Sequence, residues 1–397
     1  MRRTVEWFAW GCLLCSATAW ADPDDTLSLV VGAGLMRDDN LFRTVDERRT
    51  SDEIRSLIFG VRLDKEYSLQ RFKVNATMTD YRYRDNDYMN YMGQNLNAAW
   101  AWKLSPSLYG NLSTGRVKSL NSFTDYVAQE PERRKNIRTT STSRFDVEWE
   151  ALGPLHLISA ISHYNQKNSE LFIQDDNFSA RIGEAGIKYV TSAQSSVALV
   201  QRRTDGQYAR QANPATGLDA SFSQNDTEVR ATWNPTVKTN VSGRLAHIDR
   251  SSDNFPERNF SGNVGSVDLN WGLTEKVDLL FNLRRDLSAY QEVRNPAASY
   301  SSFYTSEMFS FSPVWKMTEK TRLKLRWSRE NRDYEGTVVN NDPMRRDKLR
   351  YSGASLEWEP RKSINVSFDY LRQSRDSSES IRNFTDNIYN LSVILNF

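Results

Sequence analysis

The stretch Asp226-Thr227-Glu228-Val229-Arg230-Ala231-Thr232-Trp233-Asn234-Pro235 contains the pattern that decides the fold. Apolar or small side chains at the odd positions alternate with charged or polar side chains at the even positions. That period of two is typical of a β-strand with one apolar face and one polar face. A tryptophan then precedes the turn-forming pair Asn234-Pro235. The stretch therefore predicts a long strand that ends in a tight turn.

The same alternation recurs along the chain from residue 27 onwards, and helical periodicity never persists for more than a turn or two. The clearest further segments are 27–35, 72–78, 145–149, 277–283, 323–327, 364–370 and 389–397. Alternation of this kind within single strands is required in a membrane barrel, where one face meets acyl chains and the other a polar interior. The sequence predicts an almost entirely β protein.

The connections between these segments alternate in length. Short turns are expected near 65–70, 105–106, 153–154, 191–195, 234–235, 274–276, 318–320 and 360–362. Longer, charged connections are expected at 37–53, 119–138, 205–221, 290–302 and 334–347. Eight short turns, with both chain ends on their side, predict about eighteen strands, with sixteen as the alternative. The expected fold is all-β: a closed antiparallel transmembrane barrel with short periplasmic turns and long extracellular loops.

Aromatic residues recur just before the short turns, about every 43 residues. In a barrel they would form a ring at the membrane interface, where amphipathic rings are favoured. The predicted girdle consists of Trp102, Trp149, Tyr189, Trp233, Trp271, Trp315 and Trp358. A soluble all-β core would not confine tryptophan to one end of every second strand. A propeller shares the period but needs four short strands per repeat, whereas each unit here contains two long ones.

The N-terminus has the features of a secretory signal peptide. Arg2 and Arg3 precede an apolar stretch, and Ala19-Trp20-Ala21 resembles a cleavage site. Residues 1–21 are therefore expected to be removed, leaving residues 22–397 as a single barrel domain exported to the bacterial outer membrane. Both cysteines, at positions 12 and 15, lie in the signal segment. The mature chain then has no thiol for a disulfide or a metal site. A lipoprotein signal around these cysteines is the poorer match.

Composition excludes several other classes. The chain has 52 Lys+Arg and 50 Asp+Glu, and removal of Arg2, Arg3 and Glu6 leaves 50 and 49. Such balance argues against a nucleic-acid partner, which would favour a basic excess. No apolar run after residue 21 approaches the roughly 20 residues that a transmembrane helix needs. Aromatic residues make up 12% of the chain, too many for a disordered protein.

Three features resemble a known family. Asp38-Asp39-Asn40-Leu41-Phe42-Arg43 follows the first strand, the run 95–113 continues from one hairpin into the next, and the chain ends on Phe397. Together they resemble the EpsL-like outer-membrane β-barrels that occur with exosortase and exopolysaccharide biosynthesis systems. The resemblance implies a part in export or assembly of an extracellular polysaccharide, with periplasmic export proteins as candidate partners. Phe397 resembles the signal that the barrel-assembly machinery reads. The family brings no catalytic motif.

The predicted inner face is charged. Basic residues Arg322, Lys324 and Arg326 are expected to face a strand with Glu357 and Glu359, which favours mutual pairing. The third long connection could fold inward as a constriction or lie on the surface as a solvated loop. Its candidate solute contacts are Asp125, Glu130, Glu132, Arg133, Arg134 and Lys135. Tyr81, Tyr83, Tyr109 and Tyr164 are expected near the outer mouth, where they could stack on a glycan or belong to an outer girdle.

The resulting functional hypothesis is a channel embedded in outer-membrane lipid that takes part in polysaccharide export or assembly. A general or sugar-selective uptake porin for small solutes is the alternative, and a glycan-binding anchor or an outer-membrane hydrolase comes next. Only His156, His163 and His247 could serve a hydrolase as a base. Ser162 and His163 are adjacent in a strand and therefore point to opposite faces. We expect no enzyme activity, no cofactor and no metal site.

Overall fold

The computed structural model describes residues 26–123, 134–170, 177–209, 219–289, 303–335 and 345–397. In this part of the chain, eighteen antiparallel strands form one sheet that closes on itself. The prediction of a closed all-β barrel of eighteen strands is thereby confirmed. The predicted signal peptide, residues 1–21, lies outside the described residues and stays a prediction.

Each strand pairs with its neighbours in chain order. The strands are β1 (Leu27–Asp38), β2 (Asp52–Tyr67), β3 (Gln70–Tyr83), β4 (Tyr91–Ser105), β5 (Leu108–Leu120), β6 (Ile137–Leu152), β7 (Leu155–Asn168), β8 (Phe178–Val190), β9 (Ser196–Tyr208), β10 (Ser221–Thr236), β11 (Thr239–Ser252), β12 (Phe260–Gly272), β13 (Val277–Ala289), β14 (Phe303–Thr318), β15 (Thr321–Glu335), β16 (Arg346–Arg361), β17 (Ile364–Ser377) and β18 (Phe384–Asn396). Single-turn 3₁₀ helices occur in the connections: η1 (Asp46–Arg48), η2 (Asp87–Met89), η4 (Pro256–Arg258) and η5 (Ser380–Arg382). No helix among the described residues has the length and hydrophobicity needed to span a bilayer.

Alternation along each strand separates the two faces of the barrel. In β1, Leu27 and Leu29 are 55% and 52% exposed on the outside, whereas Val30 between Leu29 and Val31 is 2% exposed on the inside. The register places Leu29 opposite Val61 and Val31 opposite Phe59 of β2, so apolar side chains line up on one face. An apolar outer surface of this kind is favourable only where lipid replaces water.

The barrel closes between the first and last strands. Strand β1 pairs with β2 on one side and with β18 on the other, with Val31 opposite Leu395. Beyond β18, the amide of Phe397 donates to the carbonyl oxygen of Leu29, and the amide of Leu29 donates back to Phe397. The terminal residue therefore extends the ladder to the edge of the barrel, and this pairing leaves no open sheet edge there.

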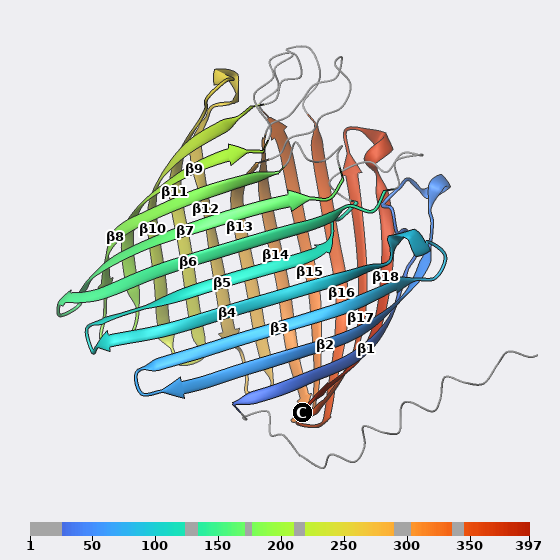
Figure 1. Ribbon diagram of the computed structural model, residues 1–397, viewed down its shortest axis with the longest axis horizontal. Helices are drawn as coiled ribbons and strands as arrows, with labels where there is room; N and C mark the ends of the chain where they lie inside the picture. Colours follow the sequence, from blue (N-terminus) through green and yellow to red (C-terminus); the bar gives the residue numbers. More distant parts are fainter. Residues whose placement is uncertain (1–25, 124–133, 171–176, 210–218, 290–302, 336–344) are drawn as a thin grey trace, which may run out of the picture.

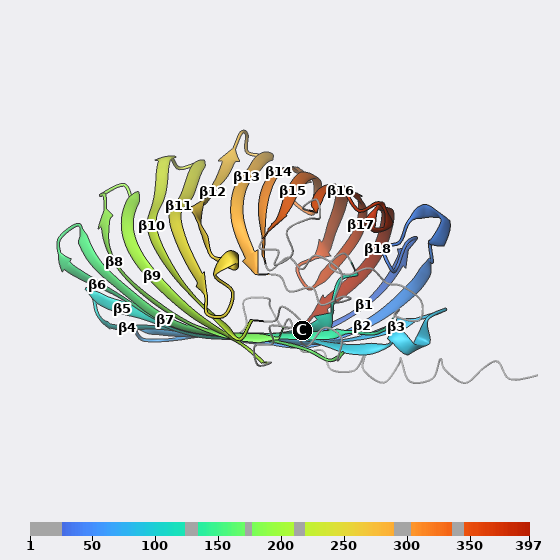
Figure 2. The ribbon, with the colours of Figure 1, turned by 90° about the horizontal axis from the view of Figure 1, so that it is seen from above.

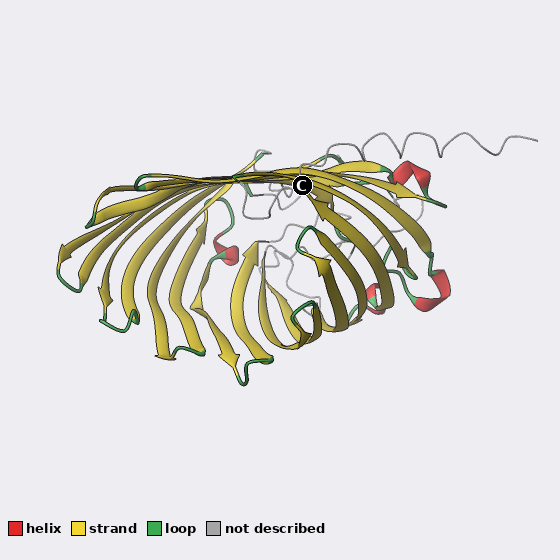
Figure 3. Cartoon of the chain, turned by 90° about the horizontal axis from the view of Figure 1, so that it is seen from below, coloured by secondary structure: helices red, strands yellow, loops and turns green. Residues whose placement is uncertain are grey.

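The cross-section is flattened rather than circular. Figure 2 shows strands β2–β7 as a nearly flat wall and strands β10–β16 as an arch over it. Seen from the opposite side, the same two walls enclose the central space (Figure 3). The C-terminus lies at the end of the barrel that carries the short turns, and the long loops lie at the other end (Figure 1). We call these the short-turn end and the long-loop end.

Two expected turns begin two residues later than the prolines that signalled them. Pro235 lies within β10 and Pro360 within β16, and each strand shifts register there, between Trp233 and Thr236 and between Trp358 and Arg361. Proline lacks the N–H that a regular ladder needs, but an irregular position tolerates it. The proline therefore marks the irregularity before the turn, and not the turn itself.

Candidate functional site: the lumen and its mouth

One arc of the inner wall is braced by ion pairs around Glu228 of β10. Its side chain is fully buried and lies 2.7 Å from a guanidinium nitrogen of both Arg230 and Arg244. Arg202 of β9 lies 3.8 Å away. Three arginines on three neighbouring strands thus share one carboxylate. Because charge-assisted bonds at this distance are strong, the acid is held in place and its charge is compensated.

Glu184 of β8 continues this arrangement. It accepts hydrogen bonds from Arg144 of β6 at 2.9 Å and from Arg230 at 3.0 Å. Closer to the short-turn end, Glu148 contacts Lys188 at 2.9 Å and His156 at 2.7 Å. All of these side chains except His156 line a hollow of about 340 Å³ on the inner face. The carboxylates of this arc are therefore engaged by cations and do not act as free negative charges.

The opposite arc differs from what the sequence suggested. Arg322 of β15 contacts Glu357 at 3.4 Å and Glu359 at 2.5 Å, as expected. Lys324, however, stands opposite Ser355, and Arg326 stands opposite Gly353. Neither makes an ion pair among the described residues. The expected ion pairs of Lys324 and Arg326 were therefore wrong. The strand register places Glu357 and Glu359 beside Arg322 only.

A third unpaired cation lies on the same arc. Arg284 of β13 stands opposite Ser266 of β12 and Met308 of β14, and it makes no ion pair in the described part of the chain. Like Lys324 and Arg326, it directly follows a lipid-facing leucine, and Leu283 is 57% exposed. We call Arg284, Lys324 and Arg326 the lumen cation strip.

The flat wall carries a second hollow. Its volume is about 590 Å³, and it is bordered by Arg62, Asp64 and Lys73 near the short-turn end and by amide side chains such as Asn75 and Asn97. The Nζ atom of Lys73 lies 3.6 Å from Asp64, across the β2–β3 ladder. This wall therefore offers hydrogen-bonding groups together with the Lys73–Asp64 pair and with Arg62, which bonds Asn396 at 3.2 Å.

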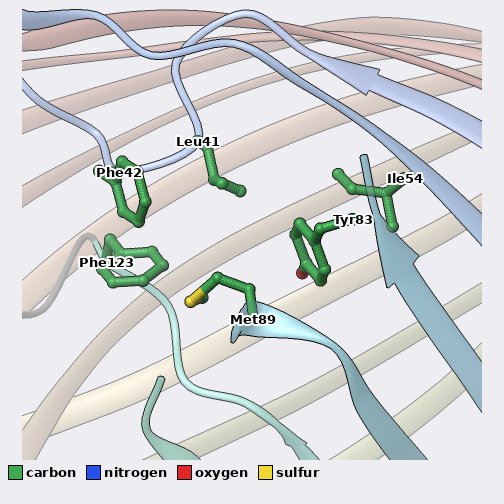
Figure 4. Close-up of a cluster of buried hydrophobic side chains, with 6 residues drawn as sticks. All are labelled: Leu41, Phe42, Ile54, Tyr83, Met89 and Phe123. Atoms are coloured by element: carbon green, nitrogen blue, oxygen red, sulfur yellow. The ribbon is translucent and has the colours of Figure 1, made fainter. Parts of the chain in front are cut away.

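At the long-loop end, a buried apolar cluster lies against the inner face (Figure 4). It consists of Leu41, Phe42, Ile54, Tyr83, Met89 and Phe123. Phe42 and Phe123, from different loops, pack edge to face at 5.1 Å. Tyr83 is 7% exposed, so its ring faces are covered and it cannot serve as a glycan platform. Sequence reasoning missed the cluster, because its members come from two strands and three separate connections.

The other three candidate tyrosines have different surroundings. Tyr81 stacks on Tyr91 at 4.7 Å, and Tyr164 contacts Phe178 at 5.2 Å, both at the long-loop end. Tyr109 was expected at the outer mouth, and this was wrong. It is the second residue of β5, which begins after a short turn, and its hydroxyl donates to Glu148 at 3.1 Å. Tyr109 therefore lies at the short-turn end.

A second inward aromatic group continues from Tyr164 and its neighbour Phe178. Phe178, Tyr208 and Phe222 pack in series from β8 to β10, with ring centroids 5.9 to 6.5 Å apart. The guanidinium of Arg250 lies 3.7 Å above the Phe222 ring, which is a favourable cation–π position. Aromatic rings and arginine thus line this side of the mouth.

The third long connection is described only at its two ends. The Nζ of Lys135 donates to the carbonyl oxygen of Asn90 at 2.9 Å, and Arg134 lies 4.0 Å from Glu170. Asn136 is fully buried and donates to Asn168. Asp125, Glu130, Glu132 and Arg133 lie outside the described residues. The constriction therefore stays a prediction.

The motif Asp38–Arg43 joins the segment after the first strand, β1, to the last strand, β18. Arg43 bridges Asp38 at 2.9 Å and Asp386 of β18 at 3.1 Å. The Nδ2 of Asn40 donates to the carbonyl oxygen of Thr385, and Asn387 donates to Asp39 through both its backbone and its side chain. Burial alone would raise the pKa of Asp39, but the bonds from Asn387 outweigh it and hold that pKa below its usual range. The carboxylate is therefore charged at neutral pH.

The outer aromatic residues lie beside the short turns. Exposed fractions range from 40% to 60% for Trp149, Tyr189, Trp233, Trp271, Trp315 and Trp358. Trp102 lies on the same outer face but is only 7% exposed, because its neighbours cover it. Its indole lies across Gly110 of the next strand and stacks on Phe145 at 5.9 Å. Trp100, two residues earlier on the same outer face, is 39% exposed.

The histidines do not form a hydrolase site. His156 is buried beside Glu148, and His163 is exposed on the outer face. His247 bonds Asn263 at 2.9 Å, and Ser261 lies 3.5 Å from its other nitrogen. The Ser261 hydroxyl instead donates to Asp249 at 2.7 Å, so its proton is not directed at the base. The backbone amides of β11 and β12 around these residues are engaged in strand pairing, so they do not form an oxyanion hole.

Comparison with known proteins supports the fold. No protein-family model and no curated protein sequence matches the chain. The structure of Pseudomonas aeruginosa OccK2 in complex with glucuronate aligns with a TM-score of 0.50 and 11% identity, over 94% of this chain and 98% of that one. A BenF-like porin from Pseudomonas fluorescens Pf-5 aligns with a TM-score of 0.50 and 12% identity, over 95% and 100%. The protein is therefore an eighteen-strand β-barrel of the bacterial outer membrane, similar in fold to these porins.

Proposed function

We propose that this chain is a channel for small hydrophilic solutes that prefers anions, with uronates as the solute class. The lumen cation strip is the observation that carries the proposal. Arg284, Lys324 and Arg326 face the lumen without ion pairs among the described residues, whereas Glu184 and Glu228 are each held by at least two arginines. Uncompensated positive charge on one wall attracts anions and repels cations inside a narrow passage.

Uronates combine features that suit this interior. A uronate has one carboxylate and several hydroxyl groups. A channel that binds it must therefore offer a cation for the carboxylate and hydrogen-bonding side chains for the hydroxyl groups. The flat wall supplies amides such as Asn75 and Asn97, and the arch supplies the cation strip. OccK2, whose fold is similar, was crystallised in complex with glucuronate.

Ion selectivity in planar bilayers tests the proposal. With a tenfold KCl gradient, the wild-type channel should pass more chloride than potassium. The double variant Lys324→Gln/Arg326→Gln should move the permeability ratio towards one, because it removes two of the three members of the lumen cation strip. Arg203→Gln/Arg285→Gln is the matched control, because it also removes two positive charges, from arginines that face outward and pair with Asp205 and Glu307. A cation-selective wild-type channel, or equal shifts in both variants, would contradict the proposal.

Export or assembly of an extracellular polysaccharide is the second candidate, with a glycan-binding anchor as its non-transporting form. The resemblance of Asp38–Arg43 to the EpsL-like family favours it. Those side chains fasten β1 to β18, however, and that contact accounts for them without a polysaccharide. Deletion of the gene distinguishes the candidates. Loss of surface polysaccharide with unchanged uronate uptake would favour export, and the reverse would favour the uptake channel.

A further inference from the structure

The outer face at the long-loop end carries a band of arginines just beyond the apolar surface. Arg329 of β15 is two residues from the exposed Trp327, and Arg55 of β2 is two residues from the exposed Leu57. Residues two apart in a strand share a face, so these arginines point outward next to the lipid-facing stripe. We define the outer arginine band as Arg37, Arg55, Arg82, Arg329, Arg350 and Arg372.

The band is continuous around the closure of the barrel. Its members come from β15, β16, β17, β1, β2 and β3, and only β18 in this run of neighbouring strands contributes none. On β18, Asn387 stands opposite Arg372, and Tyr389 stands opposite Arg37. The band therefore covers one side of the barrel at a single boundary.

Two pairs of like charges stand directly opposite each other in the band. Arg329 faces Arg350 across the β15–β16 ladder, and Arg55 faces Arg82 across the β2–β3 ladder. Directly opposed like charges destabilise a sheet. An anion placed between the two guanidinium groups converts this repulsion into attraction.

The acids nearby compensate only part of the charge. Arg82 pairs with Asp80 at 2.8 Å, and Arg350 pairs with Asp376 at 3.1 Å. Arg37, Arg55, Arg329 and Arg372 make no ion pair among the described residues, and all four are exposed. The band thus retains free donors that face away from the protein.

The position of the band identifies its partner. Groups just beyond the apolar surface at the long-loop end meet the head groups of the outer leaflet, whereas the short-turn end carries tryptophan and tyrosine at the corresponding boundary. Arginine forms two parallel hydrogen bonds with phosphate, and clustered basic residues attract anionic lipids. We infer that the outer arginine band binds the phosphorylated head group of an outer-leaflet lipid.

Binding of a defined lipid tests this inference. Native mass spectrometry of the purified barrel in detergent, with EDTA present, should show retention of an acylated glucosamine disaccharide that carries two phosphates. The dephosphorylated form of the same lipid should bind at least tenfold more weakly. This comparison uses the wild-type chain alone, so it does not depend on the folding of a variant. Equal binding of the two lipids would overturn the inference.

A pair of charge-matched variants locates the site. Arg55→Gln/Arg329→Gln/Arg372→Gln should lower retention of the diphosphorylated lipid at least tenfold. The control removes three outward arginines that already pair with acids: Arg203, Arg285 and Arg346. Both variants lose three charges, and heat-modifiable migration on gels verifies their folding. Equal loss in the two variants would show that total charge, and not this band, retains the lipid.

Discussion

Gly110 allows Trp102 to lie flat on the neighbouring strand. A Cβ atom at this position would clash with the backbone oxygen of Asp146 and would lie 2.7 Å from the Trp102 ring. Gly110→Ala should therefore force strands β4 to β6 apart and lower the free energy of unfolding by about 1–3 kcal/mol. Urea unfolding of the barrel in lipid vesicles, followed by tryptophan fluorescence, measures the change.

Gly183→Ala is the control for this prediction. Gly183 is also a strand glycine of the outer face, opposite Ile161, but a Cβ atom there would meet nothing within 4 Å. The alanine should leave stability unchanged or raise it slightly, because it reduces the conformational freedom of the unfolded chain. Equal destabilisation by both substitutions would show that loss of glycine itself, and not the Trp102 contact, matters.

At the level of single residues, alternation predicted which face a side chain occupies but not what it touches there. The lipid-facing and lumen-facing phases of β15 follow directly from Leu323, Leu325 and Trp327, because the contrast between lipid and water acts on each residue separately. Burial of Trp102 depends on a glycine in another strand. No local pattern contains that information.

Among the elements, the connection between β1 and β2 is fastened to β18 by Arg43. Its guanidinium bridges Asp38 and Asp386, whose side chains are 5% and 0% exposed. Arg43→Ala leaves two buried carboxylates without their shared cation, which costs on the order of 3 kcal/mol. Hydrogen exchange of residues 39–51 and 384–388, measured by mass spectrometry, should become faster.

Arg49→Ala tests whether any arginine of this connection has the same effect. Arg49 pairs with Asp46 three residues away, and their side chains are 32% and 71% exposed. Exposed pairs contribute little, so exchange in the two segments should stay at the wild-type rate. If Arg49→Ala and Arg43→Ala accelerate exchange equally, the bridge to β18 is not the cause.

Element order and strand number could be read from the sequence because turn signals and tryptophans recur with the hairpins. Register could not, and register decides which charges meet. Lys324 and Arg326 lack acidic partners because Glu357 and Glu359 lie at one end of β16, beside Arg322. The contact between Arg43 and Asp386 joins residues at opposite ends of the chain. Only closure of the whole sheet brings them together.

At the scale of the whole molecule, ion selectivity depends on which lumen charges remain uncompensated. Glu184 and Glu228 hold Arg144, Arg230 and Arg244 on one wall. Glu184→Gln and Glu228→Gln should each release positive charge into the lumen and raise the chloride-to-potassium permeability ratio. Measurement of reversal potentials in planar bilayers gives the ratio for each variant.

Glu307→Gln provides the comparison, because it removes one acid that pairs with Arg285 on the outer face. Net charge changes equally in all three variants, but only the first two change the lumen. Chloride preference should rise for Glu184→Gln and Glu228→Gln and stay constant for Glu307→Gln. A uniform rise in all three would mean that the field of the whole protein sets selectivity. A rise confined to the two lumen variants would show that selectivity depends on the local balance between arginine and glutamate along β6 to β11.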